Sequence, residues 1–233
     1  MTKSAYGDYF ELAKRREPLS VAAELLWQLL PPLTFATEAL VIAGAMIPAT
    51  DLGGDAFDYG VDQQHAGVAI FDGLGHGLDA GLLATAAVAA YRNSRRRGLD
   101  LADAATRVGE TIEEHFDPTR FVTGILATLD LQSGLFAWTT AGHPAPLLIR
   151  QHCVVKHLDP DNGLPFGVGP ASDVFEEQLE PGDRILLYTD GVTEARAANG
   201  ELFELEVLVD LVTRTAGDDP PPEAMRRLMH AIE

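Results

Sequence analysis

The stretch that most constrains the fold is VAIFDGLGHGLDAG at residues 68–81, because it joins two different hydrophobic patterns. A continuous apolar run over 67–71 predicts a buried strand, and Asp72 ends that run. Three glycines follow within five residues, and the Ala/Leu-rich segment 78–97 then predicts a long helix with a basic last turn. We therefore expect a carboxylate and a glycine-rich turn between a sheet strand and a helix.

The rest of the chain predicts an α+β fold. Strand patterns occur in blocks, and two helix patterns separate the second strand from the third, which favours antiparallel sheets covered by helices over an alternating βαβ order. QSG at 132–134 predicts a hairpin turn. We expect one main domain over 33–233, preceded by a segment, 1–32, that contains a helix over 9–30. The other expected helices are 101–116, 202–214 and 221–232, and the other expected strands are 36–47, 121–130, 135–141, 146–150, 153–158, 173–179 and 183–188.

Composition and charge argue against several classes of protein. The formal net charge of −18 argues against nucleic acid as a partner, since phosphate backbones attract basic surfaces. The longest apolar stretch, 82–91, is far shorter than the roughly 20 residues of a membrane helix, and no secretory signal is visible. The one cysteine, Cys153, excludes an internal disulfide and a cysteine-rich zinc site. We expect a cytoplasmic protein that binds neither nucleic acid nor membrane.

Acidic residues beside glycines form three sites that could bind a metal. Asp72 and Asp190 each follow an apolar strand and precede a glycine, so each carboxylate would project from a rigid element. Oxygen ligands of this kind suit Mg²⁺ and Mn²⁺. Asp-Gly is also a common turn pair, and the spacing alone leaves a metal site and three ordinary turns both open. The acids of the three sites are Asp51, Asp55 and Asp58, then Asp72, then Asp190 and Glu194.

Five motifs in order make the chain similar to a known family. They are GGDAFD, FDGLGHG, TAGHPAPLL, LPFGVG and YTDGVTE, and they lie within about residues 33–205. The chain resembles the SpoIIE-like (RsbU-like) PPM/PP2C serine phosphatases of bacteria. This resemblance implies a PP2C-like sandwich of two mainly antiparallel β-sheets flanked by α-helices. It also implies a binuclear Mn²⁺ or Mg²⁺ centre, and hydrolysis of phosphoserine or phosphothreonine on a phosphoprotein by attack of metal-bound water.

The resemblance also assigns roles to individual residues. Asp72 matches the carboxylate that bridges both metals, and Gly73 would offer its backbone carbonyl to one of them. Asp55 would bind directly or through water, and Asp190 would bind the other metal. Asp72 and Asp190 are thus the expected catalytic residues. Asp51 and Asp58 are interpreted as turn residues or as groups that support the ligands. The implied substrate is an anti-anti-sigma factor with a STAS domain in a partner-switching pathway.

Other features of the sequence each have two possible interpretations. His76 and His143 could act as general acids, but a histidine in a glycine-rich turn or in a hairpin turn such as AGHPAP is more often structural. The arginines at 95–97 could contact a phosphoprotein, although a solvated helix end is the commoner meaning. The helix over 9–30 could support a homodimer or pack on its own domain.

The chain departs from the family pattern at its end. The family closes with an Asp-Asp pair, a threonine and a strand after the last helix, whereas this sequence ends at Glu233. Asp218 and Asp219 do not replace the pair, because they precede that helix. We therefore expect the last strand to be missing, one metal to be weakly bound and activity to be low. The alternative function is a non-catalytic PPM-like module that binds a signalling partner.

Overall fold

The structure is a computed structural model that describes residues 28–46, 53–159, 163–171, 173–193, 204–215 and 219–232. Several sequence predictions lie outside these ranges. They concern most of the N-terminal helix and its proposed dimer contact, together with Asp51, Glu194 and Asp218. None of the helices within the described ranges combines the length and the apolar character that a membrane span requires.

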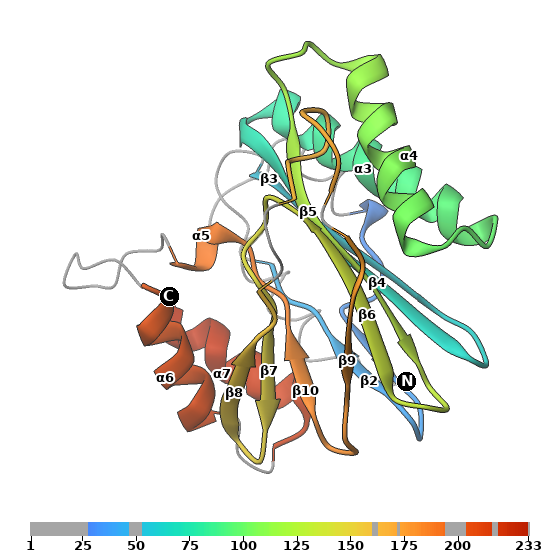
Figure 1. Cartoon of the computed structure of the whole chain (residues 1–233). Helices are drawn as coiled ribbons and strands as arrows, with labels where there is room; N and C mark the ends of the chain where they lie inside the picture. Colours follow the sequence, from blue (N-terminus) through green and yellow to red (C-terminus); the bar gives the residue numbers. More distant parts are fainter. Residues whose placement is uncertain are drawn as a thin grey trace.

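The larger sheet has five antiparallel strands and is covered by two helices. Its order is β3 (Gly53–Val61), β4 (His65–His76), β5 (Val122–Asp130), β6 (Leu135–Ala141) and β9 (Phe175–Gln178). Helices α3 (Leu78–Arg96) and α4 (Leu101–His115) connect β4 to β5 and pack on one face (Figure 1). Phe71 and Leu126 point toward these helices and pack with residues such as Leu83 and Val108.

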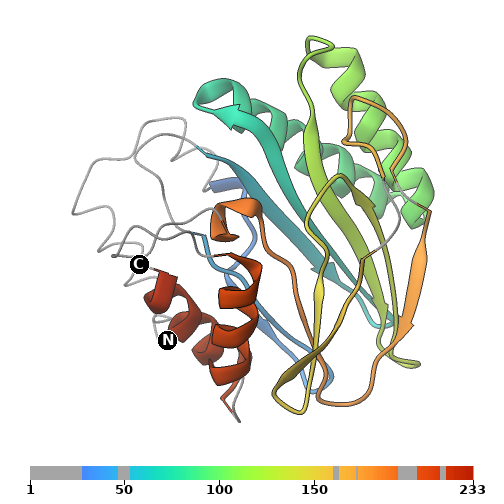
Figure 2. The same cartoon turned by 60° about the vertical axis from the view of Figure 1, so that its left-hand side comes forward.

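The smaller sheet has three antiparallel strands in the order β10 (Arg184–Leu186), β7 (Leu147–Arg150), β8 (Cys153–His157). Helices α6 (Leu205–Thr215) and α7 (Pro221–Ile232) cover its outer face through Leu208, Val212 and Leu228. Figure 2 shows these two helices on the side of the strands away from α3 and α4. A separate hairpin is formed by β1 (Thr34–Ala36) and β2 (Val41–Ala43), and α5 (Asp190–Thr193) follows the end of β10.

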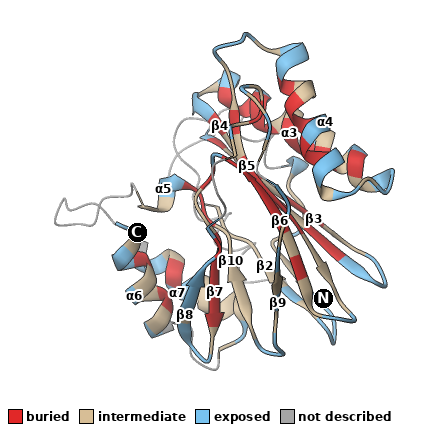
Figure 3. Cartoon of the chain, viewed as in Figure 1, coloured by how far each residue is buried: buried red, intermediate tan, exposed pale blue. Residues whose placement is uncertain are grey.

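The two sheets pack face to face, which confirms the predicted α+β sandwich. Ile125, Ala127 and Trp138 of the larger sheet belong to one buried cluster with Leu148 of β7 and Leu158 after β8. Since side chains alternate across a strand, the larger sheet buries one set of residues under α3 and α4 and the other between the sheets. Figure 3 shows buried residues along these strands and on the inner sides of the helices. Apolar packing on both faces thus holds the four layers together.

The structure corrects three sequence predictions about strands. The expected strand over 36–47 is instead the hairpin of β1 and β2. The segment 53–61, which contains the acidic site of Asp55 and Asp58 and for which no strand was predicted, is the nine-residue strand β3. Asp72 does not end a strand, because β4 continues through the glycine-rich stretch to His76.

The sequence predicted a hairpin turn at AGHPAP, and this prediction is wrong. The connection joins β6 in one sheet to β7 in the other. The hairpin over 132–134 is confirmed between β5 and β6. There the backbone N–H groups of Gln132 and Ser133 donate to the carboxylate of Asp130, a common way to stabilise a tight turn.

Candidate metal centre

Two of the predicted carboxylates lie opposite each other on neighbouring strands. The register of β3 and β4 pairs Asp55 with Asp72, and the register of β4 and β5 pairs Asp72 with Thr123. Paired residues on antiparallel strands project from the same face of a sheet. Ile70 and Ile125, two residues away on the same strands, pack between the sheets, so this row of polar residues faces the smaller sheet as well.

The third carboxylate, that of Asp190, follows a strand of the smaller sheet. Asp190 begins α5, just beyond β10. Its neighbour Thr189 donates a hydrogen bond from Oγ1 to Oδ2 of Asp55 at 3.2 Å. This contact joins the segment after β10 to strand β3. The structure therefore brings Asp55, Asp72 and Asp190 to the same end of the space between the two sheets.

The surroundings of Asp55 disfavour its negative charge. Burial raises the pKa of Asp55 to about 6, the hydrogen bond from Thr189 opposes the rise, and the negative charge of Asp190 adds to it. Two neighbouring carboxylates repel each other when both are ionised. A bound cation would relieve both the repulsion and the cost of burial. This arrangement, with its hard oxygen donors, suits a divalent ion such as Mg²⁺ or Mn²⁺.

The set of donors is nevertheless small in the part of the chain that the structure describes. There, no three carboxylate, imidazole or thiol groups lie close enough together to hold a metal by themselves. Backbone oxygens can add to such a set. The carbonyl oxygen of Gly73, the expected backbone ligand, lies against strand β3, since a Cβ atom at Gly54 would be 2.1 Å from it.

Asp58 lies on the opposite face of β3 and contacts α3. Its Oδ1 accepts hydrogen bonds from Nε of Arg92 at 2.9 Å and from Nη2 of the same residue at 2.7 Å. Arg95 approaches Oδ2 at 3.4 Å. With only 1% of Asp58 exposed, its role is to join the sheet to the helix. Asp58 is therefore a strand residue and not a turn residue, and its carboxylate contacts arginines of α3. Of the three arginines at the end of α3, Arg95 contacts Asp58, whereas Arg96 and Arg97 are exposed, as expected of a solvated helix end.

The two histidines occupy different environments. His76 is exposed at the end of β4, where Gly75 and Gly77 have positive φ angles of 89° and 84° and thus allow the tight path into α3. His143 is buried, and its ring nitrogens contact Thr123 and Tyr188. Burial lowers the pKa of His143 to about 4, so the ring is neutral near pH 7.

A cavity of about 660 Å³ adjoins this region. Its lining comes from the connection before β7, the end of β8, the residues before and within α5, and the start of α6, and includes His143, Tyr188 and Thr193. Sequence reasoning did not identify Thr123, Thr189 or this cavity. For Thr189 a signal existed, because it directly precedes Asp190 in the YTDG motif.

Antiparallel sheets packed between two helix pairs, with carboxylates at one end of their interface, define the PP2C-like class of fold. Solved structures that share this fold include the following two. The RsbU and RsbW domains of Rv1364c from Mycobacterium tuberculosis match with a TM-score of 0.66 and 28% identity, over 77% of this chain and 49% of that one. The SiaA-PP2C domain of Pseudomonas aeruginosa matches with a TM-score of 0.71 and 18% identity, over 99% of this chain and 92% of that one.

The family model described as Stage II sporulation protein E (SpoIIE) matches residues 62–233, and the chain belongs to this family. Among curated proteins, the phosphoserine phosphatase RsbU of Bacillus subtilis (strain 168) is 28% identical over 199 residues. That alignment covers 84% of this chain but 59% of RsbU, so the chain spans little more than half of this relative.

Proposed function

We propose that the chain is a metal-dependent phosphatase domain that removes phosphate from phosphoserine or phosphothreonine on a protein. The observation that carries the proposal is the meeting of Asp55, Asp72 and Asp190 at one end of the interface between the sheets, in a chain of the SpoIIE family. The name of the relative RsbU, a phosphoserine phosphatase, supports phosphoserine as the substrate group.

The proposed cofactor is a pair of Mn²⁺ or Mg²⁺ ions. Asp72 would contact both ions, Asp55 and Asp190 would each hold one of them, and the carbonyl of Gly73 would complete part of the set. Bound ions would supply Lewis acidity to the phosphoryl group and to an attacking water. The protein supplies the orientation, because Asp55 and Asp72 project from paired strands and Thr189 holds the segment of Asp190 against them.

The proposed protein substrate is a phosphorylated anti-anti-sigma factor with a STAS domain, in a partner-switching pathway. The support is the set of five ordered motifs that make the chain similar to RsbU-like phosphatases. The cavity lined by His143, Tyr188 and Thr193 offers room for residues that flank the phosphorylated serine.

One observation favours a second function, a non-catalytic PPM-like module that binds a signalling partner. Within the described ranges, no three metal-binding side chains form a complete site. A domain of this kind would keep the fold and the binding surface without turning over a phosphoprotein.

Phosphate release distinguishes the two functions. We would measure it on a phosphoserine protein and on p-nitrophenyl phosphate, with Mn²⁺, with Mg²⁺ and with a chelator. The phosphatase requires activity that depends on the metal and is abolished in Asp72→Asn, which keeps the size of the side chain. A folded wild-type protein that releases no phosphate with either ion would instead support the non-catalytic module.

A further inference from the structure

The proposed metal site is assembled from two separate sheets. Asp55 and Asp72 belong to β3 and β4 of the larger sheet, whereas Asp190 follows β10 of the smaller one. A metal site requires its ligands to be held within a few tenths of an ångström of their working positions. Some contact must therefore set the separation between the two sheets at this end.

His143 makes such a contact. It lies in the connection from β6 to β7, where the chain passes from one sheet to the other. Its Nδ1 lies 2.8 Å from Oγ1 of Thr123, the residue opposite Asp72 on β5. Its Nε2 lies 3.1 Å from the carbonyl oxygen of Tyr188, two residues before Asp190. One imidazole thus joins the residue paired with Asp72 to the residue two positions before Asp190.

The chemistry of the two partners determines the state of the ring. A carbonyl oxygen only accepts hydrogen bonds, so Nε2 must carry a proton and donate a hydrogen bond to the carbonyl oxygen of Tyr188. In the neutral ring Nδ1 is then an acceptor, and the hydroxyl of Thr123 donates to it. Burial, which lowers the pKa of His143 to about 4, keeps the ring in this state near neutral pH.

The backbone around His143 is also held in place. The hydroxyl of Thr140 contacts the carbonyl oxygens of Gly124 and His143, each at 3.4 Å. Gly142 has a positive φ of 65°, and a Cβ atom there would be 2.9 Å from the ring of Pro165. The turn that presents the imidazole is therefore constrained on both sides.

We infer that His143 is a positioning residue of the proposed metal site, and that its hydrogen bonds to Thr123 and Tyr188 set the distance between Asp72 and Asp190. This inference rests on the proposed metal-dependent function. His143 acts through the two segments that it joins, and it does not need to touch substrate or metal.

The test measures binding of Mn²⁺ alone, by calorimetry or by the electron paramagnetic resonance of the free ion. His143→Asn can keep the acceptor for Thr123, and His143→Gln can keep the donor to Tyr188, but neither side chain spans both partners. Thr123→Val removes one hydrogen bond with little change in shape. We expect each variant to weaken Mn²⁺ binding roughly tenfold, as is typical when groups that orient metal ligands are lost.

Two control variants separate positioning from stability. Thr128→Val makes the same change further along β5. Arg150→Met removes an ion pair with Asp183 at the other end of β7 and β10. Both should leave Mn²⁺ affinity unchanged, although Arg150→Met should lower the melting temperature. The inference is overturned if the Thr123 and His143 variants bind Mn²⁺ like the wild type, or if Arg150→Met weakens binding equally.

A spectroscopic measurement on the metal-free wild type is independent of both activity and metal binding. The ¹⁵N shifts of His143 should report a neutral ring with the proton on Nε2. A proton on Nδ1 would contradict the hydrogen bond to Tyr188 and overturn the inference. If instead the wild-type protein shows this ring state but binds no Mn²⁺, the proposed metal-dependent function itself fails, and the inference fails with it for that separate reason.

Discussion

The hydroxyl of Thr189 donates a hydrogen bond to Oδ2 of Asp55 at 3.2 Å, and so joins residues that lie 134 positions apart in the chain. The contact connects the segment after β10 to strand β3 and brings Asp190 beside Asp55. It also favours the ionised form of Asp55, whose pKa is raised by burial and by Asp190. One hydrogen bond therefore helps to assemble the candidate site and partly offsets its electrostatic cost.

Asp55→Asn should stabilise the metal-free protein. Folding raises the pKa of this carboxyl from 3.8 to about 6, so the folded state favours the protonated form. The stability that this carboxyl contributes is therefore fully present below about pH 4 and is lost as the pH rises through about 6. An uncharged side chain removes this loss, and the free energy of unfolding at pH 7 should rise by about 1–3 kcal/mol. Urea denaturation in chelator at pH 5 and pH 7 measures the effect.

Asp58→Asn is the matched control, since it makes the same change on the same strand. Asp58 is paired with Arg92, so this variant should be less stable than the wild type. Mn²⁺ should raise the melting temperature of the wild type but not that of Asp55→Asn. A less stable Asp55→Asn protein at pH 7 would show that the buried carboxylate already has a compensating partner.

Gly54→Ala should disrupt the strands that carry the site. A Cβ atom there would lie 2.1 Å from the carbonyl oxygen of Gly73, and this backbone atom cannot move aside without distorting β4. We expect a loss of about 2–4 kcal/mol in the free energy of unfolding, in the range of severe overpacking. Gly53→Ala is the control, because its Cβ atom would meet nothing closer than 3.9 Å. Equal stability of the two variants, measured by thermal and chemical unfolding, would contradict this account.

Gly60→Ala should be harmful only while Arg95 is present. The added Cβ atom would lie 1.5 Å from Nη1 of Arg95, whose guanidinium contacts Asp58. Displacing this side chain should cost about 1–2 kcal/mol in the free energy of unfolding. In an Arg95→Met background the same substitution should be neutral or stabilising, since alanine loses less backbone entropy than glycine. A double-mutant cycle measures the coupling, and additive effects would refute the predicted clash.

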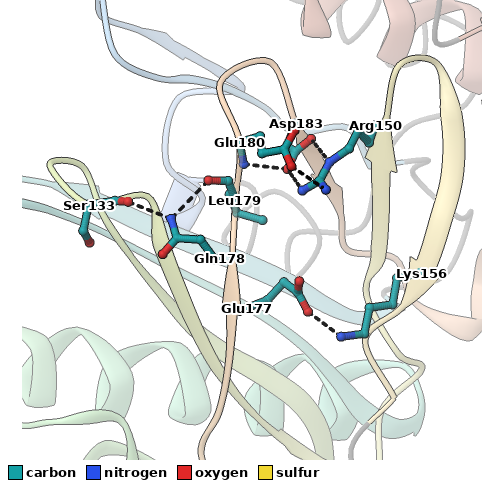
Figure 4. Close-up of polar contacts among 8 residues, drawn as sticks. All are labelled: Ser133, Arg150, Lys156, Glu177, Gln178, Leu179, Glu180 and Asp183. Atoms are coloured by element: carbon teal, nitrogen blue, oxygen red, sulfur yellow. Dashed lines mark hydrogen bonds and ion pairs between the residues drawn. The ribbon is translucent and has the colours of Figure 1, made fainter.

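Arg150→Met should destabilise the end of the sandwich remote from the site. The guanidinium of Arg150 donates to both carboxylate oxygens of Asp183, at 2.8 and 2.6 Å (Figure 4). The Asp183 side chain is only 2% exposed, so it would lose its cationic partner and keep the hydrogen bond from the backbone N–H of Glu180. We expect a lower free energy of unfolding at pH 7, because the carboxylate of Asp183 would lose the charge that compensates it.

The pH dependence of that loss tests its cause. The hydrogen bonds from Arg150 lower the pKa of Asp183, so the stability they contribute is present above its unfolded pKa and is lost as the pH falls through the folded value. The difference between wild type and Arg150→Met should therefore shrink below about pH 4. As a control, Lys156→Met removes the exposed contact with Glu177, also drawn in Figure 4, and should cost less than about 1 kcal/mol. A difference that does not change with pH would contradict the role of the Asp183 charge.

Local patterns in the sequence were sufficient for much of the fold. The periodicity of 78–97 and 101–116 predicted α3 and α4 closely, because one apolar face of each helix packs on the larger sheet. The alternation over 121–130 and 135–141, with QSG between them, predicted the hairpin of β5 and β6. The order of the motifs that contain Asp55, Asp72 and Asp190 was also sufficient to indicate the family.

Only the tertiary structure revealed strand β3 and the contacts of Asp58 and His143. Strand β3 contains glycines and acids that a local pattern assigns to a turn. In the folded chain, Gly54 lies directly against Gly73, and Gly60 lies directly against Arg95. The partners of Asp58 lie on α3, and those of His143 lie on both sides of the sheet interface. Sequence periodicity reports burial within an element, whereas hydrogen bonds and close contacts between distant elements arise only when the layers pack together.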